Sequence, residues 1–392
     1  MKSINIEKIN DSSRFDLADR LNDEVIDNAI QVAVKKVKHN IVKVGELYPS
    51  ACTTNGNYEV IKNNDWTNGF WTGMLWLSYE NTGETIFKNL ALKNVESFKY
   101  RLDHDIVTNT HDLGFLYSLS CVAAYKLTGS EMAKETALAA AKKLATRYNQ
   151  KGKFIQAWGN KGASDNYRLI VDALMNIPLL QWASEVTGDQ EYSKIANQHF
   201  LTTLKYAIRE DGSAYHTYFF DNETGVPLGG KTRQGYADNS SWARGQAWLV
   251  YGIALNYRYL KSDNILKYFE GVTNYFLNRL PQDLIPYWDL IFTDNACQSR
   301  DSSSAVIAIC GINQMMQEAN ELNFNYEKPE AAMLYNLITK YSEQETNYVI
   351  PLINHSVYSW HDGLGIDEGS IWGDYFYLEA LTRFKKKWNP YW

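Results

Sequence analysis

A helix-ending phrase that recurs along the chain constrains the fold more than any other sequence feature. It reads SYENTGETIF around Gly83, AYKLTGSEMAK around Gly129 and ASEVTGDQEYSK around Gly188. Glycine readily takes the left-handed conformation that closes a helix, and the Glu, Ser or Asp after it suits the start of the next helix. Each copy therefore predicts a tight turn between two helices, and weaker copies follow near Ser262 and after Gln317.

Pairing each amphipathic helix with the more apolar helix after it gives six helical hairpins. The predicted pairs are 22–38 with 69–82, 84–103 with 113–128, 131–149 with 167–187, 189–208 with 241–261, 263–279 with 303–323 and 329–344 with 368–385. The loops before the apolar, inner helices are long and polar, and such loops usually carry function. We predict an all-α fold, either an open solenoid or a closed (α/α)6 barrel with its long loops at one end.

The length, composition and net charge of the chain limit the class of protein to which it can belong. No Pro/Gly/Ser-rich linker divides the 392 residues, so we expect one domain over 1–392, with 1–20 as an N-terminal extension. The net charge of −6 argues against nucleic-acid binding, which needs a basic stripe. No window reaches the ~18 apolar residues of a membrane span, so we expect a cytoplasmic protein that does not bind membranes. We also expect a monomer or a weak homodimer.

The four cysteines, Cys52, Cys121, Cys297 and Cys310, show no close metal-binding spacing. In a reducing compartment they are most simply free thiols in the core. The histidines show no ligand spacing either, so we expect no metal and no organic cofactor.

Six segments lead into the six inner helices, and each contains a carboxylate. They are DWTNGFWTG, NTHDLGF, SDNYRLIVDALMNIP, DNSSWARGQAW, RDSSSA and DEGSIWGDYF. In a closed ring these groups would converge on one cavity at the positive ends of the helices, which favours an anionic ligand. The 27 tyrosines and 12 tryptophans often stand beside polar residues, which suits a sugar, although core packing explains most of them.

Two aspartates are the strongest candidates for chemistry. Asp172 interrupts the apolar run LIVDALM, and a carboxyl group in such surroundings has a raised pKa, as a proton donor requires. Pro178 belongs in a first helical turn, so we expect Asn176 to cap that helix and Asp172 to lie just before it, at the rim of the cavity. The structural alternative is that Asp172 accepts backbone N–H bonds in a turn. Asp112 would make an ordinary helix N-cap or a catalytic partner, and two carboxyl groups in one pocket suggest glycoside chemistry.

Other polar and aromatic residues leave two interpretations open. Arg244 could clamp a carboxylate with two parallel N–H bonds or brace a neighbouring loop. Trp242 and Trp248 are six residues apart and cannot share a helix face, so at most one of them needs to line the pocket. His216 lies in a long loop, where a structural and a functional role are equally plausible.

A set of motifs that follow one another along the chain adds to this interpretation of fold and site. The motifs are GFWTGMLWL, THDLGF, IQAWG, IVDALMN, DGSAYHTY, SSWARGQAW, PYWD, RDSSSA and EGSIWGDYFYLEAL. With them the chain resembles, from about residue 20 onward, the unsaturated glucuronyl hydrolases of glycoside hydrolase family 88, particularly those of streptococci and related Firmicutes. The resemblance implies an (α/α)6 barrel. It also implies a small anionic substrate, a lyase-generated glycosaminoglycan oligosaccharide of chondroitin or hyaluronan type, whose terminal uronate carries a C4=C5 double bond.

The resemblance further implies hydration of that vinyl ether and assigns roles to individual residues. Asp172 is expected to protonate C4 and to act as base toward the water that adds at C5, with Asp112 assisting. The resulting hemiketal opens and releases the rest of the saccharide. The expected substrate-binding residues are Trp71 and Trp158, which would stack on the sugar, and His111, His216, Gln234, Arg244, Trp248, Ser359 and Trp372.

The chain departs from the family pattern at two places. Arg233 stands where the family often has a histidine. Members that prefer sulfated disaccharides carry a Ser-x-x-Ser-x-Lys pattern, but here the loop reads SWHDGLG, which keeps Ser359 and places Asp362 and Leu364 at the second serine and the lysine. An acid repels a sulfate, so we expect a weaker preference for 6-sulfated units, with unsulfated chondroitin or hyaluronan disaccharides preferred.

Three rival interpretations remain at this point. The sister family of unsaturated rhamnogalacturonyl hydrolases shares the fold and the chemistry but acts on pectin fragments. A sugar epimerase of the N-acylglucosamine type would rely on paired histidines, whereas the inner-helix starts here offer acids. A non-catalytic carbohydrate-binding toroid predicts that Asp172→Asn lowers stability or binding without affecting any turnover.

Overall fold

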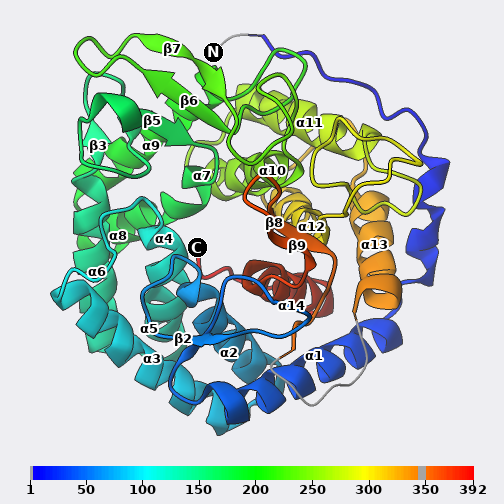
Figure 1. The fold of residues 1–392 in the computed structure, drawn as a ribbon, viewed down its shortest axis with the longest axis horizontal. Coiled ribbons are helices and arrows are strands. Elements are labelled where there is room, and N and C mark those ends of the chain that lie inside the picture. Colours follow the sequence, from blue (N-terminus) through cyan, green and yellow to red (C-terminus); the bar gives the residue numbers. More distant parts are fainter. Residues whose placement is uncertain (1–2, 343–349) are drawn as a thin grey trace.

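Two concentric rings of helices form the molecule (Figure 1). The structure is a computed structural model that describes residues 3–342 and 350–392. The outer ring consists of α1 (Asp23–Val44), α3 (Thr85–Asp103), α6 (Glu131–Ala145), α9 (Gln190–Tyr206), α11 (Asp263–Asn278) and α13 (Glu327–Asn336). The inner ring consists of α2 (Asn68–Thr82), α4 (Leu113–Tyr117) with α5 (Ala123–Thr128), α7 (Ala173–Asn176) with α8 (Pro178–Thr187), α10 (Ala243–Tyr257), α12 (Ser302–Glu318) and α14 (Ile371–Lys385). The last hairpin packs on the first through α14, α1 and α2, which closes the ring. The predicted (α/α)6 barrel is therefore confirmed, and the open solenoid is excluded. The last two residues predicted for the sixth outer helix, 343–344, lie outside the described residues.

The predicted helix ends have the expected conformation. Gly83, Gly129 and Gly188 follow α2, α5 and α8 with φ of 73°, 70° and 77°, which is the left-handed region that glycine adopts at little cost. Ser130 and Asp189 then cap the next helices, because their side chains accept the backbone N–H groups of residues 133 and 191. These local signals divide the chain into hairpins.

Inner helices are buried on every side, whereas outer helices keep one face in water. All fifteen residues of α10 are buried, while α6 buries mainly alanines along one face. Close packing inside the ring depends on small residues. A Cβ atom built on Gly311 of α12 would lie 2.5 Å from the Cα atom of Tyr251 on α10, so only glycine allows the two helices to approach this closely.

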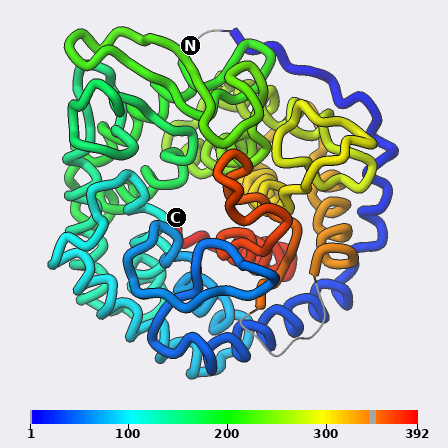
Figure 2. The backbone as a smooth tube through the Cα atoms, in the orientation of Figure 1, coloured from blue at the N-terminus to red at the C-terminus, as the bar shows by residue number. Residues whose placement is uncertain are grey.

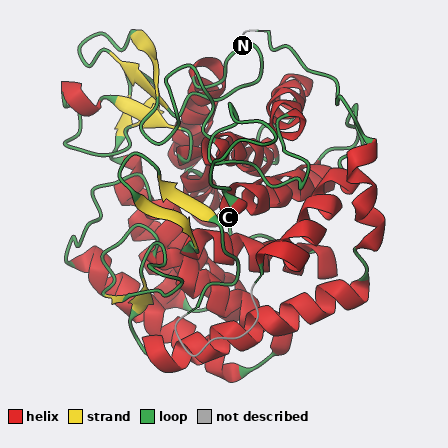
Figure 3. Ribbon diagram, turned by 45° about the vertical axis from the view of Figure 1, so that its right-hand side comes forward, coloured by secondary structure: helices red, strands yellow, loops and turns green. Residues whose placement is uncertain are grey.

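Short strands lie within the long loops, and Figure 3 shows them on one side of the helical ring. The antiparallel pairs are β1 (Tyr48–Pro49) with β2 (Val60–Ile61), β3 (Tyr148–Asn149) with β4 (Phe154–Ile155), and β8 (Ser356–Ser359) with β9 (Leu364–Glu368). β5 (Arg168–Ile170), β6 (Thr217–Phe220) and β7 (Pro227–Lys231) form a three-stranded sheet. The sequence indicated only loops here, because strands of two to five residues show no periodicity.

The N-terminal segment runs along the outside of the barrel beside α11 and α13 (Figure 2). The N–H of Asn5 donates to the carbonyl of Glu210, and Arg14 donates to the carbonyl of Leu280. The division into one domain with an N-terminal extension stays a prediction.

Two further expectations concern the whole chain. The four cysteines are free, as predicted, and Cys121 and Cys310 are buried, but Cys52 is only partly buried and Cys297 is exposed, so not all are core thiols. Within residues 3–342 and 350–392, no helix has the length and apolar character needed to cross a membrane.

Candidate active site

A cavity of about 500 Å³ opens at the end of the barrel where the inner helices begin. This volume falls in the range of small-molecule sites. Its walls are formed by Trp66, Asp112, Trp158, Ile170, Asp172, His216, Arg233, Gln234, Trp242, Arg244, Trp248, Tyr358, Ser359, Asp362 and Leu364. The cavity therefore combines aromatic rings with three acids, Asp112, Asp172 and Asp362, and two arginines.

The two candidate acids meet in the cavity because α4 and α7 touch. A Cβ atom on Gly114 would lie 2.3 Å from the Cα atom of Asn176, so glycine is required for this contact. Asn176 joins the two helices, because its Oδ1 accepts the N–H of Phe115 at 2.7 Å and its Nδ2 donates to the carbonyl of Asp172 at 3.2 Å. The expectation that Asn176 caps the helix after it is wrong, since its side chain is engaged in this bridge.

Asp112 stands at the start of α4 but does not cap it with its side chain. Its Oδ2 instead accepts the hydroxyl of Thr110 at 2.6 Å, which corrects the N-cap interpretation. Burial raises the pKa of Asp112 to about 6, and the Thr110 hydrogen bond partly opposes this rise. Asp112 is thus mostly ionised near neutral pH.

Asp172 has an even less favourable setting for a negative charge. Burial and, next, the charge of Asp112 raise the pKa of Asp172 well above its ordinary value. Its Oδ1 atom has no hydrogen-bond partner among the described residues. Both effects favour the protonated form of Asp172, which is the form able to donate a proton.

His111 lies behind the two acids rather than on the cavity wall, and it is fully buried. Its Nε2 is 3.3 Å from Asp112 Oδ1 and 3.6 Å from Asp172 Oδ1. Burial, together with the charges of Arg147 and Arg168, lowers the pKa of His111 to about 3, so the ring is neutral. The position of His111 corrects the expectation that it contacts the sugar. The three side chains have ligand atoms within 4.8 Å of one another, a grouping able to hold a metal that sequence spacing did not indicate.

His216 lies on the cavity wall with a defined tautomer. Its Nδ1 accepts the N–H groups of Arg233 at 3.0 Å and Gln234 at 3.2 Å, so the ring proton is on Nε2. Burial, with Arg244 and other arginines, lowers its pKa to about 3. His216 is thus a neutral hydrogen-bond donor toward the cavity.

Arg244 lines the cavity and also braces the loops around it. Its Nη1 is 3.1 Å from Asp301 Oδ2 and also donates to the carbonyl of Val357. Its Nη2 donates to the carbonyl of Tyr358 at 2.7 Å and to Gln234 Oε1 at 3.1 Å. Both terminal nitrogens already have protein acceptors, so the geometry favours the loop-bracing interpretation over a free carboxylate clamp.

The aromatic wall differs from the expected one in three respects. Trp71 and Trp372 are fully buried in the core and do not reach the cavity, which corrects their expected contact with the sugar. Trp66, which precedes α2, lines the cavity instead and stacks on Trp372 with ring centroids 5.6 Å apart. Trp242 and Trp248 both line the cavity, because Trp242 stands before the first residue of α10 and is not bound by its helical spacing.

The six acids expected to converge do not all reach the cavity. Asp65 accepts the N–H of Thr67, Asp238 accepts the N–H of Thr232, and Asp301 pairs with Arg244. Glu368 accepts the hydroxyl of Thr53 and the N–H groups of residues 55 and 56. These four carboxylates hold loops together, and of the expected set only Asp112 and Asp172 line the cavity.

Comparison with known proteins agrees with this geometry. The sequence pattern of Glycosyl Hydrolase Family 88 matches residues 40–365. The chain belongs to this family. It is 50% identical over 395 residues to the unsaturated chondroitin disaccharide hydrolase of Streptococcus pyogenes serotype M1, covering 100% of this chain and 99% of the relative.

Solved structures of family 88 members match along the whole chain. The crystal structure of unsaturated glucuronyl hydrolase from Streptococcus agalactiae superposes with a TM-score of 0.97 at 50% identity and covers 100% of both chains. A mutant of that enzyme complexed with dGlcA-GalNAc6S superposes with a TM-score of 0.90 at 47% identity, again over 100% of both chains. The family 88 fold predicted from the motifs is thus present throughout the chain.

Most of the residues that line this family 88 cavity could be identified from the sequence, but not all of them. The predicted site residues that line the cavity are Asp112, Trp158, Asp172, His216, Gln234, Arg244, Trp248 and Ser359. The wall residues that the sequence did not single out for the site are Trp66, Ile170 and Tyr358. Of the two tryptophans in DWTNGFWTG, Trp66 lines the cavity rather than the predicted Trp71, because a residue just before a helix has more freedom to face a cavity.

Proposed function

We propose that this family 88 protein is an unsaturated glucuronyl hydrolase acting on short, lyase-generated chondroitin or hyaluronan oligosaccharides. The observation that carries the proposal is the pair Asp112, which is buried, and Asp172, which is partly buried, two acids of raised pKa in a sugar-sized cavity with aromatic walls. The names of the similar proteins from Streptococcus support the substrate class. The four free cysteines favour a reducing, cytoplasmic setting.

In the proposed reaction Asp172 serves first as acid and then as base. The protonated carboxyl group gives its proton to C4 of the unsaturated uronate, and positive charge develops at C5. A water molecule adds to C5 as the Asp172 carboxylate takes its proton, which regenerates the acid. The C5 hemiketal then opens to a ketone and the C1 hemiacetal releases the second sugar. No covalent bond to the protein is needed.

The surrounding residues would bind and orient the anionic sugar. His216 presents an Nε2–H donor, and Trp158 offers a ring face on the cavity wall. Arg168 stacks against Trp158, with its guanidinium carbon 4.8 Å from the ring centroid. Together with Arg244, it makes the site favourable for the uronate carboxylate.

The negative charge of Asp112 should raise the pKa of Asp172, the proposed acid. Replacing Asp112 by Asn removes the negative charge that raises the pKa of Asp172. The acid then loses its proton at lower pH, so we expect the alkaline limb of the kcat/KM profile to shift to lower pH. The measurement is kcat/KM against pH for wild type and Asp112→Asn. An alkaline limb that stays in place, or moves to higher pH, would contradict this coupling.

We expect a chelator to leave the activity unchanged, although His111, Asp112 and Asp172 are grouped closely enough to hold a metal. Arg147 and Arg168 impose a positive potential on His111, and a protonated Asp172 is a poor ligand. Turnover should be measured after dialysis against EDTA, with and without added divalent ions. Loss of activity that returns with a divalent ion would contradict the metal-free mechanism.

The proposed function is tested by following the ultraviolet absorbance of the conjugated double bond in an unsaturated chondroitin disaccharide. We expect the absorbance to fall with wild type. Persistence of the absorbance, with loss of the double bond in a pectin-derived disaccharide, would instead support the rhamnogalacturonyl activity. Persistence in both would support a non-catalytic carbohydrate-binding role.

A further inference from the structure

One wall of the cavity continues as a face of the sheet formed by β5, β6 and β7. Ile170, the last residue of β5, lines the cavity. Side chains alternate along a strand and paired residues share a face, so the register decides which side chains lie beyond it. Ile170 pairs with Thr217 of β6, which in turn pairs with Lys231 of β7. Two residues further out, Arg168 pairs with Phe219. These five side chains therefore project from the same face of the sheet.

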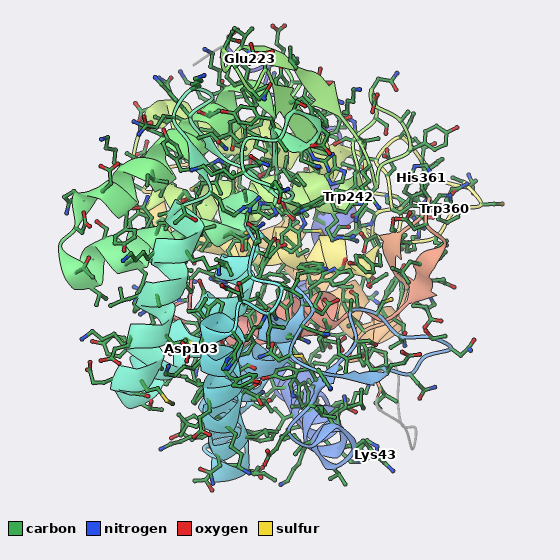
Figure 4. The ribbon with its side chains drawn as sticks, turned by 60° about the vertical axis from the view of Figure 1, so that its left-hand side comes forward. Lys43, Asp103, Glu223, Trp242, Trp360 and His361 are labelled. Atoms are coloured by element: carbon green, nitrogen blue, oxygen red, sulfur yellow. The ribbon has the colours of Figure 1, made fainter. Side chains whose placement is uncertain are left out.

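The sheet runs from the cavity toward the surface of the molecule. His216, just before β6, and Arg233, shortly after β7, both line the cavity. The turn between β6 and β7 lies at the other end of the sheet and carries the exposed Glu223. Figure 4 shows Glu223 at the edge of the molecule, whereas Trp242, which lines the cavity, lies nearer its centre. The face that begins at Ile170 thus leads out of the cavity.

Cations and aromatic rings alternate along this face. The Nζ atom of Lys231 lies 5.7 Å from the ring centroid of Phe219, and the guanidinium carbon of Arg168 lies 5.2 Å from the same centroid. The other ring beside Arg168 is Trp158, on the cavity wall. Gly229 pairs with Phe219 on β7, and a Cβ atom built on it would have no neighbour within 4 Å. The face therefore has open space next to its row of rings and cations.

The two cations of this face have no carboxylate partner. Among residues 3–342 and 350–392, no carboxylate oxygen lies within 4 Å of a side-chain nitrogen of Arg168 or Lys231. The Nε atom of Arg168 and the Oγ1 atom of Thr217 are buried without a hydrogen-bond partner in that part of the chain. Arg233, in contrast, already lies 3.6 Å from Asp362. The sheet face is thus the part of the cavity surroundings that suits an additional anionic group.

We propose that the sheet face bearing Arg168, Phe219 and Lys231 binds the third sugar of a longer oligosaccharide, a glucuronate. This inference deepens the proposed function and rests on it. Uronate and amino sugar alternate in chondroitin and hyaluronan, so a tetrasaccharide with its unsaturated uronate at Asp172 carries a glucuronate as its third sugar. Lys231 pairs with the carboxylate of that glucuronate, and Phe219 stacks on its C–H face. Arg168, between Trp158 and Phe219, adds positive potential for both uronates.

The test compares kcat/KM for the unsaturated hyaluronan tetrasaccharide and disaccharide, expressed as a ratio. Hyaluronan carries no sulfate, so the uronate carboxylates are the only charged groups of either substrate. We expect Lys231→Gln to lower the ratio about threefold, the size of an exposed ion pair. This loss should shrink as salt is added, because exposed charges are screened. Phe219→Leu should also lower the ratio, since it removes the ring on which the third sugar stacks.

Lys205→Gln is the matched control, because it removes the same charge on the other side of the sheet. The Nζ atom of Lys205 lies 4.8 Å from the ring centroid of Tyr206 on α9, and that ring packs against Tyr218 at 5.4 Å. Tyr218 follows Thr217 in β6 and therefore projects from the opposite face. The ratio should stay at the wild-type value. An equal fall in Lys205→Gln and Lys231→Gln would overturn the site, because net charge alone would explain both.

The remaining outcomes separate the third-sugar site from the proposed function. An unchanged ratio in both Lys231→Gln and Phe219→Leu, with turnover of the disaccharide by wild type, overturns the third-sugar site alone. Turnover of the disaccharide without turnover of the tetrasaccharide by wild type does the same. Absence of turnover of both substrates by wild type contradicts the proposed function and the third-sugar site together.

Discussion

Asp172→Asn should lower kcat by about a hundredfold to ten-thousandfold, the usual contribution of a positioned general acid or base. The amide keeps the shape of the side chain but has no acidic proton to give to C4. The fold should persist, because the substitution removes a carboxyl group that burial disfavours. Turnover is measured with the unsaturated chondroitin disaccharide, and thermal unfolding is measured in parallel.

Asp165→Asn is the matched control for that variant. Asp165 is exposed on the short 3-10 helix Ser164–Asn166 before β5 and does not line the cavity, so the same substitution there should leave kcat within about twofold. If Asp172→Asn kept a similar rate, Asp172 would not be the proton donor. Loss of stability or binding without any wild-type turnover would favour the carbohydrate-binding interpretation.

Arg244→Met should lower the free energy of unfolding by about 3–5 kcal/mol, because it leaves one member of a buried ion pair uncompensated. Arg244 and Asp301 are both almost fully buried, with side chains 2% and 0% exposed. The substitution also leaves the carbonyl groups of Val357 and Tyr358 without this donor. The measurement is denaturant unfolding followed by circular dichroism.

Two further variants separate the buried pair from ordinary loss of an arginine. Arg258→Met removes a partly exposed arginine just after α10, 3.7 Å from Glu318, and should cost less than about 1 kcal/mol. Adding Asp301→Asn to Arg244→Met should recover part of the stability, because the stranded charge is removed. Equal costs for Arg244→Met and Arg258→Met would contradict the bracing role.

The fold could be predicted largely because its signals are local. Gly83, Gly129 and Gly188 each mark a helix end by their own conformational preference, and Ser130 and Asp189 cap the next helix within one turn. Six hairpins of alternating apolar character leave few architectures. Whether the ring closes could not be predicted from the sequence, because closure depends on contacts between the first and the last hairpin.

The site was less predictable, because side-chain directions near loops depend on distant partners. Asp172 stood out by its apolar neighbours, but no local signal shows that Arg244 pairs with Asp301, 57 residues away. His111 and Trp71 belong to the right segments, yet packing turns both into the core. Trp66 lines the cavity because it precedes α2, the helix in which Trp71 is buried.

The central claim, protonation of C4 by the protein, is tested most directly by running the reaction in heavy water. Asp172 exchanges its proton with the solvent and delivers it from one side of the cavity. The account predicts that early product carries a single deuterium at C4 in one configuration, as seen by proton NMR. Product with deuterium distributed equally between the two C4 positions would contradict it, because the double bond would then have been protonated in solution after ordinary glycoside hydrolysis.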